Sequence, residues 1–525
     1  MTGPAAPPTA ASRLVATGGL GTSVPSVRTA VLLGSLGTIV HLLGAWRVAL
    51  WTDEAATVSA ATRSWSELAD LVSGIDAVHV LHAAILHVWI DVAGASPLAL
   101  RLPSALATGL AVAGVHVLAS RLTDRRTALL AAVVAIALPR LAWAGIEARS
   151  FAFSAAAAVW TTEVLVRAVA RPSRTRWAGY GVLAAVGVLL NIYGALVVAA
   201  HLVTLTVLRT PRSLLVGWAA AAGTAAVVTA PFVLLVARQS AQLGNSETSP
   251  AALVRNVVVN QWFLGETPTP AGATTPLVPR DDLLHGAWAP AAVLLAVLCW
   301  GLVALGTVVA LRRRDPAAVW VLAWLVLPTA AIVALALVTG SGYAPRYATV
   351  SAPAVALAVA LGLVALPRRR SLVALACVLA LAVPVLASQR RPDAKNGSDW
   401  DVVAATLGAH AAPADAVYFP VRPGEGPAGR SLRAVRIAYP DAFGEMPDVT
   451  LAASPATSGT LWGTSADLVA SVDRLEGVDV VWLIVRDDHP AIALALDLAT
   501  LDEAGFGLVV DHSTRRTTLL EVRRG

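Results

Sequence analysis

The stretch AVLLGSLGTIVHLLGAWRVALWTDE, residues 30–54, decides the fold class of this chain. It begins as a long apolar run and ends on two adjacent carboxylates, Asp53 and Glu54. About 20 mostly apolar residues are enough to cross a bilayer as a helix. Ionisable groups at a membrane boundary are costly and are usually retained for function. The stretch therefore predicts an uncleaved membrane anchor with an acidic pair at its outer end.

The composition of the whole chain agrees with a membrane protein. Of 525 residues, 57% are hydrophobic and only 14% are charged, against about a quarter in soluble domains. This excludes a cytosolic enzyme, a disordered protein and a nucleic-acid binder. Residues 389–525 hold 13 basic and 19 acidic groups, whereas residues 1–388 hold 26 basic and 14 acidic groups. A basic excess within apolar sequence is typical of arginine-rich cytoplasmic loops between membrane spans.

Apolar runs recur along the chain and predict about eleven transmembrane helices. They lie at 28–50, 98–120, 127–143, 151–170, 178–191, 194–208, 214–236, 287–311, 317–338, 348–366 and 371–388. The apolar sequence 178–208 is divided at Asn191–Gly194, because a single span would be too long. Residues 1–27, rich in Pro, Ala, Thr and Gly, predict a disordered cytoplasmic tail.

Arginine placement predicts the orientation. With this threading, dense clusters such as Arg312–Arg314 and Arg368–Arg370 all fall on one side. By the positive-inside rule that side is cytoplasmic, so we expect a multi-pass protein of the cell membrane with a cytoplasmic N-terminus. The acidic pair then lies outside. Residues 78–93 are apolar but short, and predict an interfacial or re-entrant helix at the outer surface.

The segment 389–525 predicts a soluble, extracytoplasmic α/β domain. Strands are expected at 416–421 and 479–485, helices at 399–410, 465–475 and 491–504, and a terminal strand pair at 507–522. Strands that alternate with helices favour this fold class. The segment has no glycine fingerprint for a nucleotide, so it is assigned no chemistry.

Three arginines open predicted spans from the outer side, where Asp53 lies. Arg101, Arg149 and Arg346 come from distant parts of the chain. Guanidinium groups suit phosphate oxygens, so the three together indicate a site for the phosphate of a lipid. For any single arginine the alternative is snorkelling at a helix end. For the acidic pair it is a hydrated loop start or a helix N-cap.

Further polar side chains are expected near the same surface. His79 and His82 lie one helical turn apart, and with Asp53 or Glu54 they would suit a divalent cation, although interfacial hydrogen bonding explains them more simply. No metal ligand is therefore assigned. Glu147 is placed to hold Arg149. Five residues are candidates for substrate binding: His79, His82, Glu147, Tyr193 and Tyr347. A simple helical turn explains Tyr193 and the neighbouring Asn191 equally well.

The order of these motifs resembles that of a known family. An Asp-Glu pair after the first span, a short interfacial helix, Arg101-Leu102-Pro103-Ser104, Glu147-Ala148-Arg149-Ser150-Phe151 and Arg346-Tyr347 are similar to the GT-C polytopic glycosyltransferases. The similarity is to family 39-like members, relatives of protein O-mannosyltransferases and aminoarabinose transferases, including bacterial members with a periplasmic domain. Many relatives have His-Pro-Pro after the acidic pair, whereas this chain has Val78-His79-Val80-Leu81-His82.

The resemblance implies a transferase that uses a polyprenyl-phosphate sugar, with mannose expected. The acceptor would be a glycan, lipid or protein outside the membrane. Asp53 matches the catalytic base, Glu54 an acceptor-binding acid, and the three arginines basic positions near the lipid phosphate. One displacement at the anomeric carbon implies inversion.

Three alternatives stay open. The first is an arabinosyl or other pentosyl transferase of the same class. The second is a lipid-linked sugar flippase, which is disfavoured because the two halves show no inverted repeat. The third is a non-catalytic assembly protein whose tail binds an envelope polymer.

Overall fold

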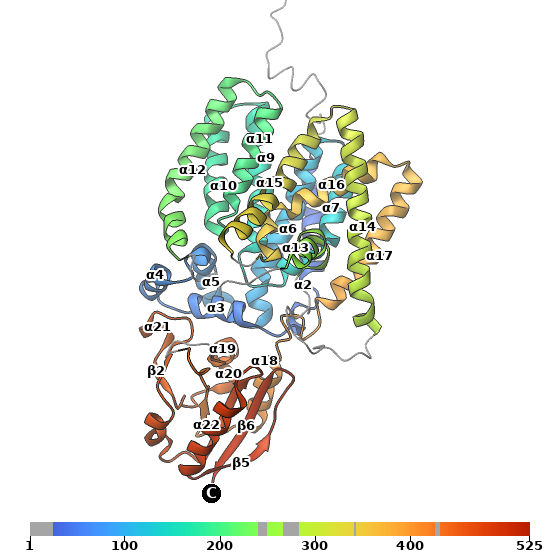
Figure 1. Cartoon of the computed structure of the whole chain (residues 1–525). Helices are drawn as coiled ribbons and strands as arrows, with labels where there is room; N and C mark the ends of the chain where they lie inside the picture. Colours follow the sequence, from blue (N-terminus) through green and yellow to red (C-terminus); the bar gives the residue numbers. More distant parts are fainter. Residues whose placement is uncertain (1–24, 240–248, 266–282, 341–342, 426–430) are drawn as a thin grey trace, which may run out of the picture.

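The computed structural model describes residues 25–239, 249–265, 283–340, 343–425 and 431–525. A bundle of long helices forms one part, and a smaller α/β domain lies at one end of it (Figure 1). A layer of short helices, α3 to α5, lies between the two parts (Figure 1). Most of the predicted tail, residues 1–24, lies outside the described residues.

Each of the eleven predicted apolar runs coincides with helical structure. Within the part of the chain that the structure describes, eight candidate spans are long and apolar enough to cross a membrane by length and composition. They contain α2 (Val27–Leu42), α6 (Pro97–Leu122), α9 (Phe151–Ala170), α12 (Arg212–Arg238), α14 (Leu283–Arg312), α15 (Pro316–Thr339), η5 with α16 (Pro345–Ser351 and Ala352–Ala365) and α17 (Arg368–Ser388). The predicted fold class is confirmed.

The remaining three runs are shorter or broken. α7 (Arg125–Ala137) and α8 (Pro139–Gly145) form a pair bent by 59°, because Pro139 offers no N–H to continue the helix. α10 (Arg174–Leu190) and α11 (Gly194–Val207) are separate helices, as the predicted division at Asn191–Gly194 requires. A short segment of α13 (Pro250–Arg255) and η4 (Asn256–Leu264) lies between α12 and α14.

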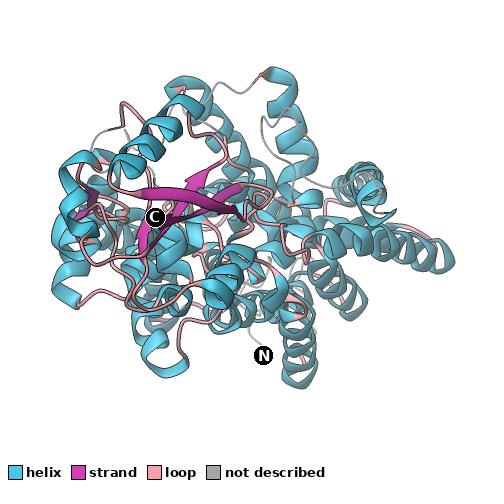
Figure 2. Ribbon diagram, turned by 90° about the horizontal axis from the view of Figure 1, so that it is seen from below, coloured by secondary structure: helices cyan, strands magenta, loops and turns pink. Residues whose placement is uncertain are grey.

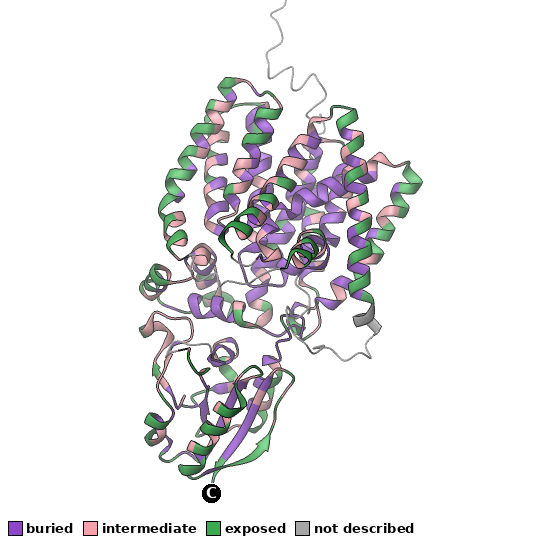
Figure 3. Ribbon diagram, viewed as in Figure 1, coloured by how far each residue is buried: buried purple, intermediate pink, exposed green. Residues whose placement is uncertain are grey.

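The outer helices expose apolar side chains that only a lipid environment would cover. Val27, Val227 and Val338 are 75%, 74% and 85% exposed, and α12 is exposed along its outward face whereas the bundle centre is buried (Figure 3). The connections between α11 and α12 and between α14 and α15, which carry arginine clusters, lie at the end of the bundle away from the α/β domain (Figure 1). The predicted threading places the arginine clusters and the C-terminal domain on opposite sides of the membrane, and in the structure they lie at opposite ends of the bundle. Which end is cytoplasmic stays a prediction.

The intermediate layer begins where the first span ends. After η1 (Ala45–Arg47) the chain turns into α3 (Thr52–Ala61), α4 (Trp65–Gly74), η2 (Ala77–His79) and α5 (Val80–Ala93). Ser64 and Glu67 form a capping box at the start of α4. The 14 residues of α5 are too few to cross a bilayer, which agrees with the short helix predicted at 78–93.

The C-terminal domain contains a mixed four-stranded sheet in the order β1-β4-β6-β5. β1 and β4 are parallel, and β6 is antiparallel to both β4 and β5. Figure 2 shows the strands among the helices of this end of the molecule. The elements are α18 (Trp400–His410), β1 (Ala416–Tyr418), α19 (Arg433–Ala438), α20 (Pro440–Phe443), β2 (Leu451–Ala453), α21 (Pro455–Ser458), β3 (Thr464–Ser465), η6 (Val469–Leu475), β4 (Val480–Arg486), α22 (Ala491–Glu503), β5 (Phe506–Asp511) and β6 (Thr517–Arg524). The β2–β3 pair and α19 to α21 were not predicted.

A hydrophobic cluster joins the C-terminal domain to the layer of α3 to α5. Leu50 and Val58, from the segment around α3, share this cluster with Trp400, Phe419 and Ile484 of the domain. The residues around the acidic pair are therefore packed from both sides.

Candidate active site

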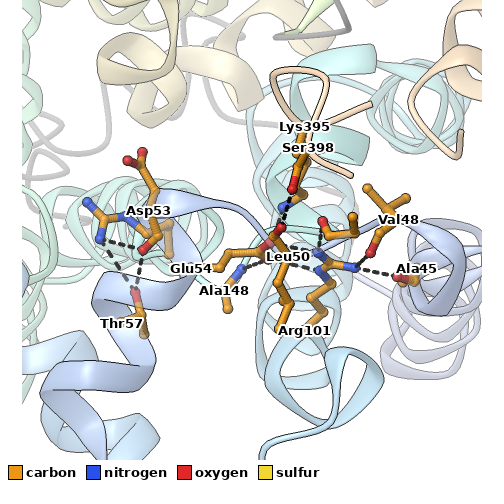
Figure 4. Close-up of polar contacts among 12 residues, drawn as sticks. Ala45, Val48, Leu50, Asp53, Glu54, Thr57, Arg101, Ala148, Lys395 and Ser398 are labelled. Atoms are coloured by element: carbon orange, nitrogen blue, oxygen red, sulfur yellow. Dashed lines mark hydrogen bonds and ion pairs between the residues drawn. The ribbon is translucent and has the colours of Figure 1, made fainter. Parts of the chain in front are cut away.

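The acidic pair occupies the first turn of α3, and its two carboxylates point in different directions. Successive residues of an α-helix are about 100° apart, since there are 3.6 residues per turn. Figure 4 shows the Asp53 side chain directed away from the cluster that surrounds Glu54. The two acids therefore lie in different environments and have different capacities.

Glu54 lies at the centre of a buried ionic network. Arg101 Nη2 lies 2.6 Å from its Oε2, and Arg101 Nε donates to its Oε1 at 2.8 Å. Lys395 Nζ lies 2.9 Å from Oε1, and the backbone N–H of Ala148 donates to the same oxygen at 2.9 Å. All three ionic side chains are 0% exposed. No acceptor molecule can reach Glu54 in this arrangement, so its expected role in acceptor binding is not supported.

Arg101 has no donor left for a lipid phosphate. A guanidinium carries five N–H donors, and here two bonds go to Glu54 and three to backbone carbonyls. Those carbonyls belong to Ala45, Val48 and Ala49, at 2.6, 2.7 and 3.1 Å. The expectation that Arg101 joins the other two arginines is therefore wrong, because α6 directs it into the protein interior.

Opposing forces determine the charge state of this network. Burial would raise the pKa of Glu54, but the charges of Arg101 and Lys395 outweigh it and lower that pKa to about 2. Burial also lowers the pKa of Lys395 to about 8, although the Glu54 carboxylate counteracts it. Near neutral pH the network thus contains two cations around one carboxylate.

Asp53 faces a partly open region that contains Arg346. Arg346 Nη2 lies 3.4 Å from Asp53 Oδ2, and the two side chains are 25% and 24% exposed. The same guanidinium lies over the rings of Trp51 and Tyr347, 5.9 and 6.0 Å from their centroids. Arg346 is therefore the cation that lies beside Asp53 and within reach of a ligand.

Arg149 lies beneath Asp53 and is almost fully buried. Its Nη1 donates to the Asp53 carbonyl at 3.1 Å and to Thr57 Oγ1 at 3.4 Å. Its Nη2 donates to His79 Nε2 at 2.5 Å. Its Nε is buried and has no hydrogen-bond partner among the described residues. Arg149 and Arg346 thus both lie at Asp53, as predicted.

The predicted tyrosines also meet here. The rings of Tyr193, from the break between α10 and α11, and Tyr347 are 5.3 Å apart. Glu147 is buried, and its carbonyl accepts from the backbone N–H of Arg149 at 2.8 Å. His82 is buried and packs edge-on against Phe153. Tyr193 and Tyr347 therefore border the Asp53 region, whereas Glu147 and His82 lie in its buried surroundings.

His79 and Asp76 set the electrostatics below the site. Burial, assisted by the charge of Arg149, holds the pKa of His79 well below its usual value of 6.5. Burial raises the pKa of Asp76 to about 6, and the nearby Asp53 carboxylate adds to this. His79 Nε2 accepts a hydrogen bond from Arg149, so the guanidinium occupies the position that a metal ion bound to this nitrogen would need. Among the described residues, no His, Cys, Asp or Glu group of three or more is placed to hold a metal ion.

Sequence reasoning missed Lys395, Trp51 and Asp76. The available signal for Lys395 was its rarity, since it is the only lysine among 39 basic residues. Its partner Glu54 is too distant in the chain for spacing to connect them.

Comparisons with known proteins agree with this architecture. Residues 79–235 match the family model for dolichyl-phosphate-mannose-protein mannosyltransferase. ArnT from Cupriavidus metallidurans in the apo state is similar in structure, with a TM-score of 0.58 and 14% identity over 94% of this chain and 97% of that chain. The same protein bound to undecaprenyl phosphate gives 0.57, with the same identity and coverage.

A second solved structure shares the fold at lower similarity. Archaeal oligosaccharyltransferase AglB from Archaeoglobus fulgidus, in complex with an inhibitory peptide and a dolichol-phosphate, gives a TM-score of 0.50. The identity is 11% over 94% of this chain and 74% of that chain. No curated protein sequence matches the chain. The family match and the shared fold confirm the resemblance to the GT-C membrane glycosyltransferases.

Proposed function

We propose that this protein transfers a sugar, with mannose as the first candidate, from a polyprenyl phosphate to an acceptor outside the membrane. The observation that carries the proposal is the partly exposed Asp53 carboxylate beside Arg346, with Arg149 beneath it. A base and cations at one accessible point are what a displacement from a phosphate leaving group needs. The mannosyltransferase family model that matches residues 79–235 supports both the lipid-phosphate donor and the choice of sugar.

The reaction is a single displacement. An acceptor hydroxyl oxygen bonds to the anomeric carbon and its proton passes to an Asp53 carboxylate oxygen. The bond from that carbon to the phosphate oxygen breaks, and the oxygen keeps the electron pair. Arg346 contacts the departing lipid phosphate, and the nearby positive charge of Arg149 adds to its stabilisation. Attack from the face opposite the leaving group inverts the anomeric configuration.

Asp53→Asn tests the base, because the amide keeps the shape but cannot take up the proton. General base catalysis contributes about 10²–10⁴-fold, so turnover of polyprenyl-phosphate mannose should fall by at least about 10²-fold. Donor binding and expression should be retained. Asp70→Asn, on the exposed surface of α4, is the matched control and should transfer normally.

The same assay distinguishes the alternatives. Polyprenyl-phosphate arabinose in a parallel reaction reports a pentosyl transferase, and product NMR reports the anomeric configuration. Arg346→Ala should raise the donor KM more than the acceptor KM. If Asp53→Asn transfers at the wild-type rate, or if the wild type moves intact donor across a vesicle membrane without transfer, the proposal fails.

A further inference from the structure

The C-terminal domain and the segment leading to it form hydrogen bonds with the residues that precede α3. The N–H of Ala49 donates to the carbonyl of Pro392 at 2.9 Å. Ser398 Oγ donates to the carbonyl of Leu50 at 2.6 Å, and the N–H of Leu50 donates to the Tyr439 hydroxyl at 2.8 Å. The residues just before Asp53 therefore take their backbone partners from a part of the chain more than 300 positions away.

The other end of α3 is held in the same way. Ser59 Oγ donates to the carbonyl of Leu461 at 2.7 Å, and Arg63 Nη2 donates to the carbonyl of Thr460 at 2.5 Å. The helix that carries the acidic pair is thus fixed at both ends by the C-terminal domain.

Lys395 adds an ion pair with Glu54 to the hydrogen bonds that hold the two ends of α3. It lies after α17, in the segment that leads into the domain, and its Nζ is 2.9 Å from Glu54 Oε1. The ammonium also lies over the Trp143 ring, 5.5 Å from its centroid. A buried charge is stable only when it is paired, so Lys395 and Glu54 constrain one another tightly. Glu54 is the immediate neighbour of the proposed base.

We propose that Lys395 is a positioning residue of the active centre. By holding Glu54 it fixes the rotation of the first turn of α3, and this directs Asp53 toward Arg346. The inference rests on the proposed role of Asp53. It makes the C-terminal segment a component of the catalytic centre through its contact with Glu54.

The test replaces Lys395 by a neutral side chain of similar length. Misplacement of a catalytic group by 1 Å costs about 10²-fold, so Lys395→Met should lower kcat by about 10- to 100-fold with little change in donor KM. Lys395→Arg, which keeps the charge, should recover part of this loss. Because Lys395 acts through Glu54, the double variant Lys395→Met/Glu54→Gln should lose little more than the worse single variant.

Arg121→Met is the matched control. Glu163 is buried like Glu54 and has two cationic partners, Arg121 at 2.6 Å and Arg167 at 3.7 Å, but it lies on other helices. Removing Arg121 takes one cation from a buried carboxylate and should lower thermal stability without lowering kcat comparably. If Lys395→Met and Arg121→Met lose stability alike and both retain kcat, Lys395 is merely structural.

A second measurement does not depend on the sugar. Since Lys395 is the only lysine, an amine-reactive reagent labels it alone apart from the amino terminus. It should stay unlabelled in the folded wild type and become labelled in Glu54→Gln; labelling in the folded wild type would contradict the buried pair. A wild type without transfer would overturn the proposed function, whereas an active wild type with unaffected Lys395→Met would overturn only the role of Lys395.

Discussion

Asp53 and Glu54 are neighbours in sequence with opposite surroundings. Asp53 is partly exposed beside one accessible arginine, whereas Glu54 is buried between two cations. This difference is the reason for proposing a chemical role for the first and an anchoring role for the second. It also predicts how each should respond to pH, because only the Glu54 network contains a group whose charge changes at mildly alkaline pH.

We expect transfer activity to fall as the pH rises above about 8. Burial lowers the pKa of Lys395 from 10.5 to about 8, with Glu54 and Glu147 opposing the shift and Arg101 reinforcing it. Above that pH the folded protein loses the Lys395 charge, and Glu54 keeps only Arg101. A pH profile of kcat for Lys395→Arg should lack this fall, since an arginine stays protonated.

Stability should respond to the same group with the opposite sign. Between about pH 8 and 10.5 the unfolded chain binds this proton more tightly than the folded chain, so the contribution of Lys395 to stability rises with pH. A parallel loss of thermal stability in this range would attribute the fall in activity to unfolding instead, and would contradict the prediction.

The sequence was sufficient to place some site residues and not others. Asp53, Arg149 and Arg346 were predictable because each lies near the start of an element on the same predicted side of the membrane, and the ends of spans on one side converge. Arg101 satisfies the same criterion, yet it points inward, because its direction depends on the carbonyls of Ala45, Val48 and Ala49. Lys395 was not predictable, because only tertiary folding brings it to Glu54.

At the scale of elements, the breaks were more informative than the helices. Dividing 178–208 at Asn191–Gly194 was correct, and that break carries Tyr193 into the site. The bend at Pro139 was not predicted, because a proline in an apolar run either kinks a span or ends it. The bent pair of α7 and α8 presents the Trp143 ring to Lys395.

Close packing of α14 against α16 gives a prediction at this scale. A Cβ added at Gly362 would lie 2.1 Å from the carbonyl oxygen of Leu302, so the two backbones touch. Small residues allow such approaches between membrane helices. Gly362→Leu should destabilise the folded protein by at least about 1–3 kcal/mol, measured as thermal unfolding in detergent.

Gly301→Leu is the control for this substitution. Gly301 is on α14, the helix that Gly362 of α16 contacts, and a Cβ there meets nothing within 4 Å. If both variants unfold at the same temperature, the contact between α14 and α16 is looser than described.

At the scale of the whole molecule, the two ends of the helix bundle differ in what they carry. The arginine-bearing connections lie at one end and the α/β domain, with the site beside it, at the other (Figure 1). The alternation of helices predicted this division from sequence. The interface between α3 and the C-terminal domain was not predictable from sequence. Its contacts join residues more than 300 positions apart, which no local sequence pattern relates.

We expect the C-terminal domain to lie outside the cytoplasm. Alkaline phosphatase fused after Gly525 should be active, because this enzyme matures only after export, and a cytoplasmic reporter at the same point should be silent. The reverse pattern would place the arginine clusters outside and would overturn the proposed topology. A fusion in the connection between α14 and α15 should behave in the opposite way and serves as the control.

The hydrogen bonds between the C-terminal segment and the region of α3 have a consequence for the time course of biosynthesis. The hydrogen bond from Ser398 Oγ to the carbonyl of Leu50 cannot form until Ser398 has been synthesised, 348 positions later in the chain. At about 5–20 residues per second, the ribosome reaches Ser398 roughly 20–70 s after Leu50. Until then α3, which carries Asp53, lacks the contacts that orient it. We therefore expect the nascent protein to be inactive until residues 389–525 have been translated and folded.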